Sequence, residues 1–231
     1  QLPMTFASYE ELDYVRGKLA PEIEKKMSDA GFIVLTWGDA GWVHLFSKKA
    51  ARVPDDLRSE KMFLWANAPD SEKAWKAAGF DPVPMSSTDV LGALQSGLIS
   101  WYGTTPLFAL TSQWFALTPN MISVKWTPLN GATIISKKRW EKIPAELRPE
   151  LMRIAREEGA ALIQEERSLG DKAIAEMKKR GLKVVEADAK IIAEWKATAD
   201  MAKPVLRGEL IEAALYDRVQ ALVAEYRAGK K

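Results

Sequence analysis

The sequence predicts an α/β fold built around a mainly parallel sheet, and three observations carry this prediction. Short apolar runs, such as residues 32–35 and 62–65, alternate with longer stretches in which apolar residues recur at helical spacing. Gly and Pro mark the changes from one to the other, and connections this short favour right-handed crossovers between parallel strands. An apolar content of 47% in 231 residues supplies the core of one large domain or two small ones.

The first predicted element is a helix that begins at Ser8. Ser8 and Glu11 form a capping box, and apolar residues from Leu12 to Met27 follow at helical spacing. Pro21 interrupts this series, so we expect a kink there or two separate helices.

Strands and helices then alternate through the middle of the chain. The runs at 32–35 and 62–65 predict buried strands. Asp70 and Gly79 mark the two ends of a predicted helix, and residues 83–85 form a brief extended segment.

The next predicted helix starts at Ser87 or Thr88. Its apolar residues Val90, Leu91 and Leu94 recur at helical spacing, so we expect all three to face inward.

Residues 97–107, GLISWYGTTPL, begin like a buried strand and end like the rim of a pocket. Two aromatic rings and two hydroxyl groups precede Pro106, which fits the first turn of a further helix capped by Thr105. Trp101 and Tyr102 are adjacent on the predicted strand, so their rings point to opposite faces of the sheet. One of the two is therefore expected to belong to the core.

The last third of the chain is predicted to be mostly helical. A strand at 132–136 precedes a helical stretch from Pro144 to Arg180, rich in Ala, Glu, Lys and Arg. Residues 182–185 could add one edge strand, and amphipathic helices follow at 191–201 and 210–226.

Composition excludes several classes of function. The 33 basic and 31 acidic side chains leave a net charge of +2. Proteins that bind nucleic acid usually carry a clear excess of Lys and Arg on one face, so this charge disfavours such a function. No apolar run approaches the roughly 20 residues needed to cross a bilayer. The absence of Cys excludes disulfides and thiolate metal sites, and a single histidine, His44, excludes a multi-histidine metal site. We expect no metal and no cofactor.

Five short segments, in order, resemble one known family. Its entry to a strand is similar to Pro54–Lys61, its "lG-a-x-P-v-p-m" segment to Ala77–Met85, and its "e-v-y-x-A-L-q-x-G" helix to Asp89–Gly97. Its turn into the carboxy-terminal helices is similar to Ile135–Trp140 and Ile143–Leu147. The chain thus resembles the solute-binding (P) subunits of tripartite ATP-independent periplasmic (TRAP) transporters, of the dicarboxylate type.

This resemblance implies a two-lobe periplasmic binding protein fold, type II-like, with a ligand cleft between the lobes. Residues 1–50 would be the remaining part of the amino-terminal lobe and the first crossing strand, and residues 51–130 the second lobe. Residues 131–231 would hold the return strand and the long carboxy-terminal helices that brace both lobes. Family members carry roughly another hundred residues before the part that resembles Gln1–Gly31, so we expect a longer polypeptide.

The sequence departs from the family at the expected ligand clamp. Members usually carry an Arg in the strand after Lys61, and its planar guanidinium forks onto the substrate carboxylate. Phe63 stands at that position here. The acidic residue, Gly and Asn that often end the next strand are replaced by Ser100, Trp101 and Thr104. An aromatic, hydroxyl-lined cleft suits a less polar ligand than a dicarboxylate.

The candidate ligand-binding residues lie on the strands and turns that would line this cleft. They are Trp37, Trp42, Phe63, Trp65, Ser86, Ser87, Trp101, Tyr102, Thr104, Thr105 and Trp126.

Structural roles compete with ligand contact at several of these positions. Trp37 and Trp42 flank the segment Gly38–Gly41, which resembles the family's loop after its first crossing strand but also suits a surface turn with packed rings. Ser86 and Ser87 could bind an anion or simply cap a helix. His44 favours a structural, hydrogen-bonded role, and Asp39 alone is a weak indication of a cation site.

Three classes of function follow from these observations. We favour a periplasmic receptor that binds a small organic acid or a weakly polar, aromatic solute and delivers it to the membrane subunits of a TRAP transporter. An enzyme is disfavoured, because paired acids such as Glu165 and Glu166 belong to a charged helix and the chain offers few nucleophiles or bases. The alternative is a binding-protein fold reused as a sensory or protein-interaction module without transported cargo.

Overall fold

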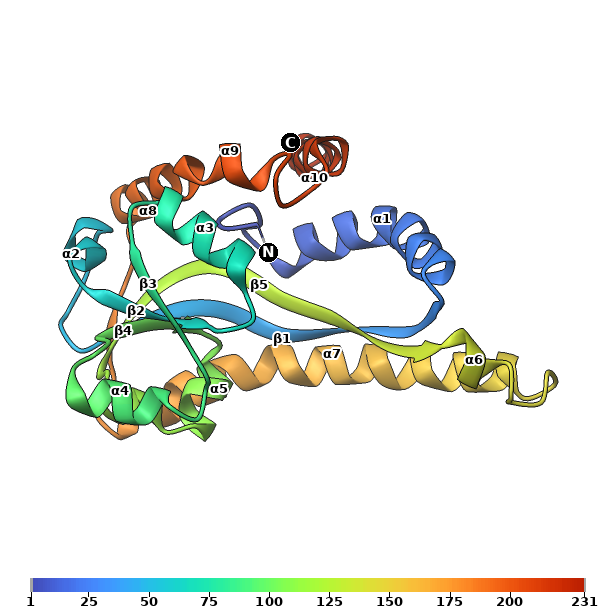
Figure 1. The fold of residues 1–231 in the computed structure, drawn as a ribbon, viewed down its shortest axis with the longest axis horizontal. Coiled ribbons are helices and arrows are strands. Elements are labelled where there is room, and N and C mark those ends of the chain that lie inside the picture. Colours follow the sequence, from blue (N-terminus) through green and yellow to red (C-terminus); the bar gives the residue numbers. More distant parts are fainter. Residues whose placement is uncertain (1, 231) are drawn as a thin grey trace.

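Two long strands, β1 (Phe32–Ser47) and β5 (Asn120–Ser136), cross the molecule side by side (Figure 1). They pair antiparallel, from Phe32 opposite Ser136 to Ser47 opposite Asn120. The computed structural model describes residues 2–230. Gln1, which begins the predicted segment 1–50, and Lys231, which ends the predicted segment 131–231, lie outside the described residues.

Both crossing strands belong to a six-stranded mixed sheet of order β3-β2-β4-β1-β5-β6. The other strands are β2 (Lys61–Trp65), β3 (Asp81–Met85), β4 (Trp101–Thr104) and β6 (Lys183–Val185). The pairs β2–β3, β2–β4 and β5–β6 are parallel, whereas β1 runs antiparallel to both β4 and β5. The predicted edge strand is confirmed as β6. The prediction of a mainly parallel sheet is wrong at its centre, because the crossing strands run back along each other.

Helices cover both faces of this sheet (Figure 1). The long helices are α1 (Tyr9–Asp29), α7 (Arg148–Lys179), α8 (Ala189–Met201) and α10 (Ala213–Ala228). The shorter ones are α2 (Asp55–Arg58), α3 (Pro69–Ala77), α4 (Val90–Ser96), α5 (Pro106–Thr111), α6 (Lys137–Trp140), α9 (Lys203–Leu206) and the 3-10 turn Trp114–Ala116. In Figure 1, α7 runs under the crossing strands, while α1, α3, α8 and α10 lie above them.

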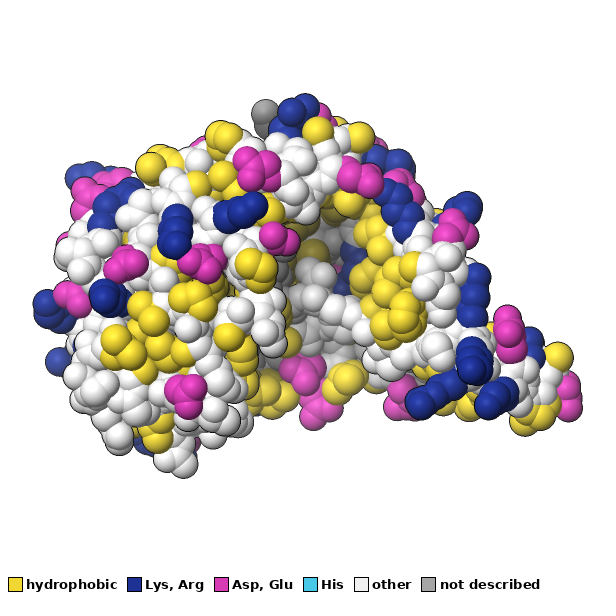
Figure 2. Space-filling model, viewed as in Figure 1, with side chains coloured by type: hydrophobic (Ala, Val, Ile, Leu, Met, Phe, Trp, Pro, Cys, Tyr) yellow, Lys and Arg dark blue, Asp and Glu magenta, His cyan; other side chains and the backbone are white. Residues whose placement is uncertain are grey.

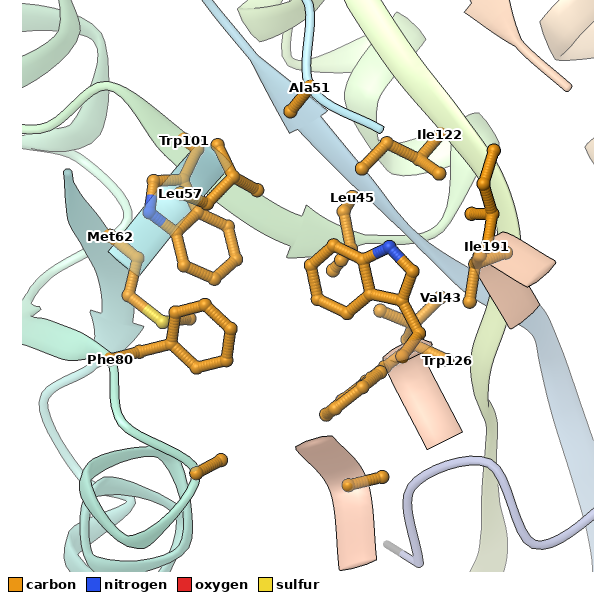
Figure 3. Packing of buried hydrophobic residues seen from close by; sticks show 14 residues of the cluster. Val43, Leu45, Ala51, Leu57, Met62, Phe80, Trp101, Ile122, Trp126 and Ile191 are labelled. Atoms are coloured by element: carbon orange, nitrogen blue, oxygen red, sulfur yellow. The ribbon is translucent and has the colours of Figure 1, made fainter. Parts of the chain in front are cut away.

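The two largest apolar clusters lie on opposite faces of the sheet. The first contains Trp101, Trp126 and Trp195, and Figure 3 shows side chains from several elements of this cluster turned toward one another. The second contains Tyr102, Phe46 and residues of α4 and α5. Trp101 and Tyr102 therefore point to opposite faces, as predicted.

The first helix is one continuous element. Ser8 caps it by accepting from the Glu11 amide at 3.3 Å, as predicted, and Pro21 lies inside α1, so the alternative of two helices is wrong. Pro21 removes one N–H donor from the helix, and the buried apolar residues of α1, which are Leu12, Val15 and Leu19, all precede it.

Segment Gly38–Gly41 is part of strand β1 rather than a loop after it. The pairing of β1 with β5 shifts register between Asp39 and Trp42, and Gly41 within this irregularity has a φ of 90°. A bulge of this kind lets a strand continue past residues that would otherwise form a turn.

Some helix boundaries and one inward residue differ from prediction. Helix α3 begins at Pro69 after Ala68, and Asp89 rather than Ser87 or Thr88 precedes α4. Leu91 is 41% exposed, because α4 has only seven residues and buries a narrow face. Pro144 precedes a turn at residues 145–147, and α7 starts at Arg148.

Candidate functional site

The two candidate residues of β1 lie in different surroundings. Trp37 is half-buried, donates from Nε1 to Glu24 at 2.9 Å and lines a groove of about 270 Å³ between α1 and α10. Trp42 is buried, and its ring centroid is 5.3 Å from that of Tyr9. It lines a separate cavity together with His44. The structure therefore does not bring Trp37 and Trp42 into one site.

Phe63 and Trp65 share one face of β2, as the alternation of a strand predicts. Their ring centroids are 5.1 Å apart, and Phe63 also packs against Trp114 at 5.4 Å. Phe63 is 3% exposed, whereas Trp65 at the end of the strand is 45% exposed. The residue at the expected Arg position is thus part of the core, and its neighbour is accessible.

Ser86 and Ser87 lie in the turn that leads from β3 into α4. Ser86 is exposed, and its hydroxyl lies 2.9 Å from that of Thr88 and accepts from the Thr88 amide at 3.4 Å. Ser86 therefore stabilises the turn before the helix, and Ser87 beside it is half-buried.

The candidate residues at 101–105 are all buried. Trp101 and Tyr102 are 0% exposed, and both polar groups are paired: Trp101 Nε1 donates to the Glu60 carbonyl at 3.0 Å, and the Thr118 hydroxyl donates to the Tyr102 hydroxyl at 2.9 Å. Thr104 and Thr105 are also buried, and Thr105 precedes α5 as predicted. The idea that these residues form the rim of a pocket is not met in this structure. The Trp101 ring packs against Trp75 and Phe80 on one face of the sheet, and the Tyr102 ring packs against Phe46 and Trp114 on the other.

Trp126 lies at the wall of an open cavity on the face of the sheet that also carries Trp101. Its ring is stacked on Trp75 of α3, with centroids 4.8 Å apart and planes at 14°. We call the adjoining space the Trp75–Trp126 cavity. It has a volume of about 200 Å³ and lies where α3, the middle of β5 and the segment 202–211 meet.

Three polar side chains add to the aromatic wall of this cavity. They are Asp70 and Ser71, at the start of α3, and Thr127 on β5. Among the described residues no Lys or Arg lines it. The space-filling view shows this face of the molecule hollowed between the part that carries α3 and the part that carries α1 (Figure 2). The cavity offers flat apolar surface, two hydroxyls and one carboxylate.

Trp75 was missed from the sequence because its helix has a weak apolar pattern, with no fully buried residue. The signal that could have found it is the spacing of Ser71, Ala74, Trp75 and Ala78, which places these four residues on one face of α3.

A second missed feature is a cluster of ion pairs that joins α1, β1 and α7, which we call the Asp39 cluster. Asp39, with 1% of its side chain exposed, accepts from Arg16 at 2.6 Å and from Arg167 at 2.8 Å. Asp13 bonds to both arginines, and its hydrogen bond with Arg167 lowers the pKa of its carboxyl. Asp39 is therefore neutralised by arginines rather than poised for a cation.

No group of acidic or histidine side chains in residues 2–230 is arranged to hold a metal ion. Over the same residues, no helix combines the length and apolar character needed to cross a membrane.

Comparison with known proteins identifies relatives for nearly the whole chain. The sequence pattern of the family described as "Bacterial extracellular solute-binding protein, family 7" matches residues 1–207. The C4-dicarboxylate-binding periplasmic protein DctP of Rhodobacter capsulatus is 26% identical over 148 residues, which is 64% of this chain and 44% of that protein. The 2,3-diketo-L-gulonate-binding periplasmic protein YiaO of Escherichia coli is 25% identical over 176 residues, 73% of this chain and 52% of that protein. The chain thus spans about half the length of these curated relatives.

Solved structures show the same fold. A TRAP periplasmic solute-binding protein from Ralstonia eutropha, with bound (S)-2-acetolactate, superposes with a TM-score of 0.86 at 21% identity, covering 97% of this chain and 73% of that one. A TRAP solute-binding protein from Sulfurospirillum deleyianum, with bound succinate, gives 0.82 at 24% identity, covering 96% and 73%. The sequence match and the shared fold agree, and the chain belongs to the bacterial extracellular solute-binding proteins of family 7, the DctP family.

Proposed function

We propose that this protein is a periplasmic receptor that binds a small organic acid, or a weakly polar aromatic solute, and delivers it to the membrane subunits of a TRAP transporter. Family membership supports the class of protein. Similar structures have been solved with bound acids, including succinate and β-D-galacturonate. The predicted division into segments 1–50, 51–130 and 131–231 and the cleft between two lobes belong to this proposal, with closure by a hinge in the crossing strands.

The observation that carries the choice of site is the Trp75–Trp126 cavity. Stacked indoles give it a flat apolar wall, and Ser71 and Thr127 offer hydroxyls to a polar end of the solute. An apolar pocket with few convergent polar groups is the usual form of a small-molecule site. The cavity lies beside the start of α3, which follows the carboxyl end of β2, the edge at which open α/β sheets bind ligands.

Charge favours a monocarboxylate or an aromatic solute over a dicarboxylate in this cavity. Its lining contains Asp70 and no cation among the described residues, so a solute carboxylate has only the hydroxyls of Ser71 and Thr127 as partners, and a dicarboxylate would leave its second carboxylate without any. On the other face of the sheet, the buried Phe63 packs on Trp114 at the position where the family's Arg clamp is expected, so that position supplies no guanidinium.

The sequence-predicted residues divide into three groups under this proposal. Trp126 forms the wall, and Trp65, Ser86 and Ser87 are accessible where β2 and β3 end. The core residues beneath the accessible ones are Phe63, Trp101, Tyr102, Thr104 and Thr105. Trp37 lines the groove between α1 and α10, and Trp42 lines the cavity that also contains His44.

A thermal-shift panel of monocarboxylates, dicarboxylates, keto acids and aromatic acids tests the proposal. A solute at about a hundredfold excess over its Kd stabilises the folded state by about 2.7 kcal/mol, or roughly 5–10 °C in Tm. We expect the largest shift from an aromatic or weakly polar acid. Succinate or malate giving the largest shift would contradict the proposed chemistry, and no shift with any solute would favour the interaction module.

Filling the cavity locates the site. Ser71→Trp on α3 places an indole in the Trp75–Trp126 cavity and should abolish the thermal shift of the best solute. Lys73→Trp, on the same helix but outside the cavity, is the matched control and should keep it. Equal shifts in both variants would place the solute elsewhere.

A further inference from the structure

Two residues that line one cavity on the α7 side of the sheet carry buried polar atoms without partners. Trp42 and His44 are 6% and 7% exposed, and neither Trp42 Nε1 nor His44 Nδ1 has a hydrogen-bond partner in the described part of the chain. Both residues line a cavity of about 250 Å³ between β1, β5, β6 and α7, which we call the His44 cavity. A buried polar group left unpaired is costly, so these atoms call for a bound molecule.

A bulge in β5 creates this cavity. Val43 pairs with Thr127, whereas Leu45 pairs with Ile122, so residues 123–126 have no counterpart in the ladder except His44. Two of them, Ser123 and Lys125, line the cavity. Bulges often re-aim side chains beside binding sites.

The two unpaired atoms are one donor and one acceptor. An indole Nε1 can only donate. Burial lowers the pKa of His44 to about 4, so its imidazole is neutral near pH 7, and the carbonyls of Ile122 and Val124 act on the ring as acceptors. Nδ1 is the ring nitrogen without a partner, and in the tautomer that carries its proton on Nε2 it offers a free lone pair.

The charges around the cavity are also of two kinds. Lys125 Nζ lies 5.2 Å from the centroid of the Trp42 ring, and neither Lys125 nor Asp171 has an ion-pair partner among the described residues. The remaining charges are matched: Arg167 by Asp13 and Asp39, and Lys178 by Glu186 at 4.0 Å. Tyr9 is the other titratable group of the lining, and burial raises its pKa to about 12, so it stays neutral.

From this arrangement we infer that the His44 cavity is a second binding site, separate from the Trp75–Trp126 cavity, and that it takes a small zwitterion, an α-amino acid. The carboxylate of the ligand pairs with Lys125 and accepts from Trp42 Nε1. Its ammonium group pairs with Asp171 and donates to His44 Nδ1. The volume suits about ten non-hydrogen atoms, since a cavity of about 150 Å³ already holds benzene. This inference does not rest on the proposed receptor function.

The single histidine gives an unambiguous readout of this site. In protein labelled with both ¹⁵N-histidine and ¹⁵N-tryptophan, the one imidazole is His44, and the Trp42 indole signal is assigned by its loss in Trp42→Phe. We expect glycine, L-valine or L-leucine to shift both His44 Nδ1 and Trp42 Nε1. No response from any of the three means that the cavity holds water only and overturns the inference.

Matched ligands test each end of the zwitterion. Isobutylamine lacks the carboxylate of valine and 3-methylbutanoate lacks its ammonium group, so each loses a charge-assisted hydrogen bond and should bind about tenfold more weakly or worse. Equal affinity of valine and 3-methylbutanoate would show that Asp171 and His44 do not bind the ammonium group of the ligand.

Variants locate the binding within the fold. Asp171→Asn should weaken valine about tenfold and leave 3-methylbutanoate unchanged, while Glu165→Gln on the same helix is the control. Trp42→Phe should weaken valine, and Trp37→Phe on the same strand should not, because Trp37 lines another groove.

The two proposals fail separately. If Ser71→Trp abolishes valine binding while Trp42→Phe and Asp171→Asn leave it intact, valine binds in the Trp75–Trp126 cavity and the second site is overturned. If the acids of the thermal-shift panel have no effect while valine behaves as expected at His44, the second site stands and the proposed cargo chemistry fails.

Discussion

His44 is almost completely buried, and its Nδ1 atom has no hydrogen-bond partner in the described part of the chain. His44 is only 7% exposed, and desolvation is the largest cause of its lowered pKa. Lys125 adds to this fall, while the carbonyls of Ile122 and Val124 and the charge of Asp171 oppose it. The imidazole is therefore a neutral hydrogen-bonding group over the whole physiological pH range.

We predict that His44 titrates near pH 4 in the folded protein and near 6.5 in the unfolded chain. Below pH 6.5 the unfolded state takes up a proton that the folded state refuses, so this group makes the protein less stable as pH falls from 6.5 to about 4. The difference amounts to about 3 kcal/mol. NMR of the imidazole protons measures both values, with the urea-unfolded chain as control. Titration near 6.5 in the folded state would contradict the prediction.

At the scale of elements, the contact between α7 and β1 depends on one missing side chain. Gly159 of α7 is buried against Thr36 of β1, and a Cβ built on Gly159 would overlap the Thr36 hydroxyl and lie 2.7 Å from Thr36 Cβ. Gly170, eleven residues further along the same helix, has open space at the same position. Helix α7 therefore packs closely on β1 at Gly159 and has open space beside it at Gly170.

This geometry predicts opposite effects of the same substitution. Gly159→Ala should lower the free energy of unfolding by about 2 kcal/mol, because α7 or Thr36 must move. Gly170→Ala should raise it by about 0.5–1 kcal/mol, because Ala restricts the unfolded chain and suits a helix. Urea unfolding curves measure both. A stabilising Gly159→Ala would show that α7 adjusts without strain.

Elements with a strong local signal could be predicted from the sequence, and those decided by distant contacts could not. The cap at Ser8 and the strand 183–185 depend on nearby residues and were found. The extension of β1 through Gly38–Gly41 depends on pairing with β5, some ninety residues away, so the local Gly pattern was misleading. For the candidate site, residue types located Trp126, but not Trp75 or the burial of residues 101–105, which depends on packing between elements.

At the scale of the whole molecule, the Asp39 cluster ties three distant parts of the chain together. Asp39 lies on β1, Arg16 on α1 and Arg167 on α7, and the exposed fractions of the two arginine side chains are only 16% and 11%. The Tyr9 ring also lies 4.3 Å from the Arg167 guanidinium carbon. An ion pair this buried adds little net stability compared with apolar packing, but breaking it leaves unpaired charge inside the protein.

Asp39→Asn should therefore lower the free energy of unfolding by about 3 kcal/mol, or roughly 6–12 °C in Tm. Asp29→Asn is the control, because Asp29 is exposed and pairs with Lys25, which is also exposed, so its loss should cost less than about 0.5 kcal/mol. Calorimetry of both variants at neutral pH measures the difference. Similar values for the two would mean that solvent reaches the arginines once Asp39 is neutral.

The pairing of the crossing strands also has a consequence for the timing of folding. Phe32 pairs with Ser136, and about a hundred residues separate the two along the chain. At a synthesis rate of about 5–20 residues per second, β1 waits about 5–20 seconds before all of β5 has been made. During that interval the hydrogen-bonding edge of β1 that later receives β5 is open to other chains. A chain with this topology gains from a chaperone that shields the early strand until its partner arrives.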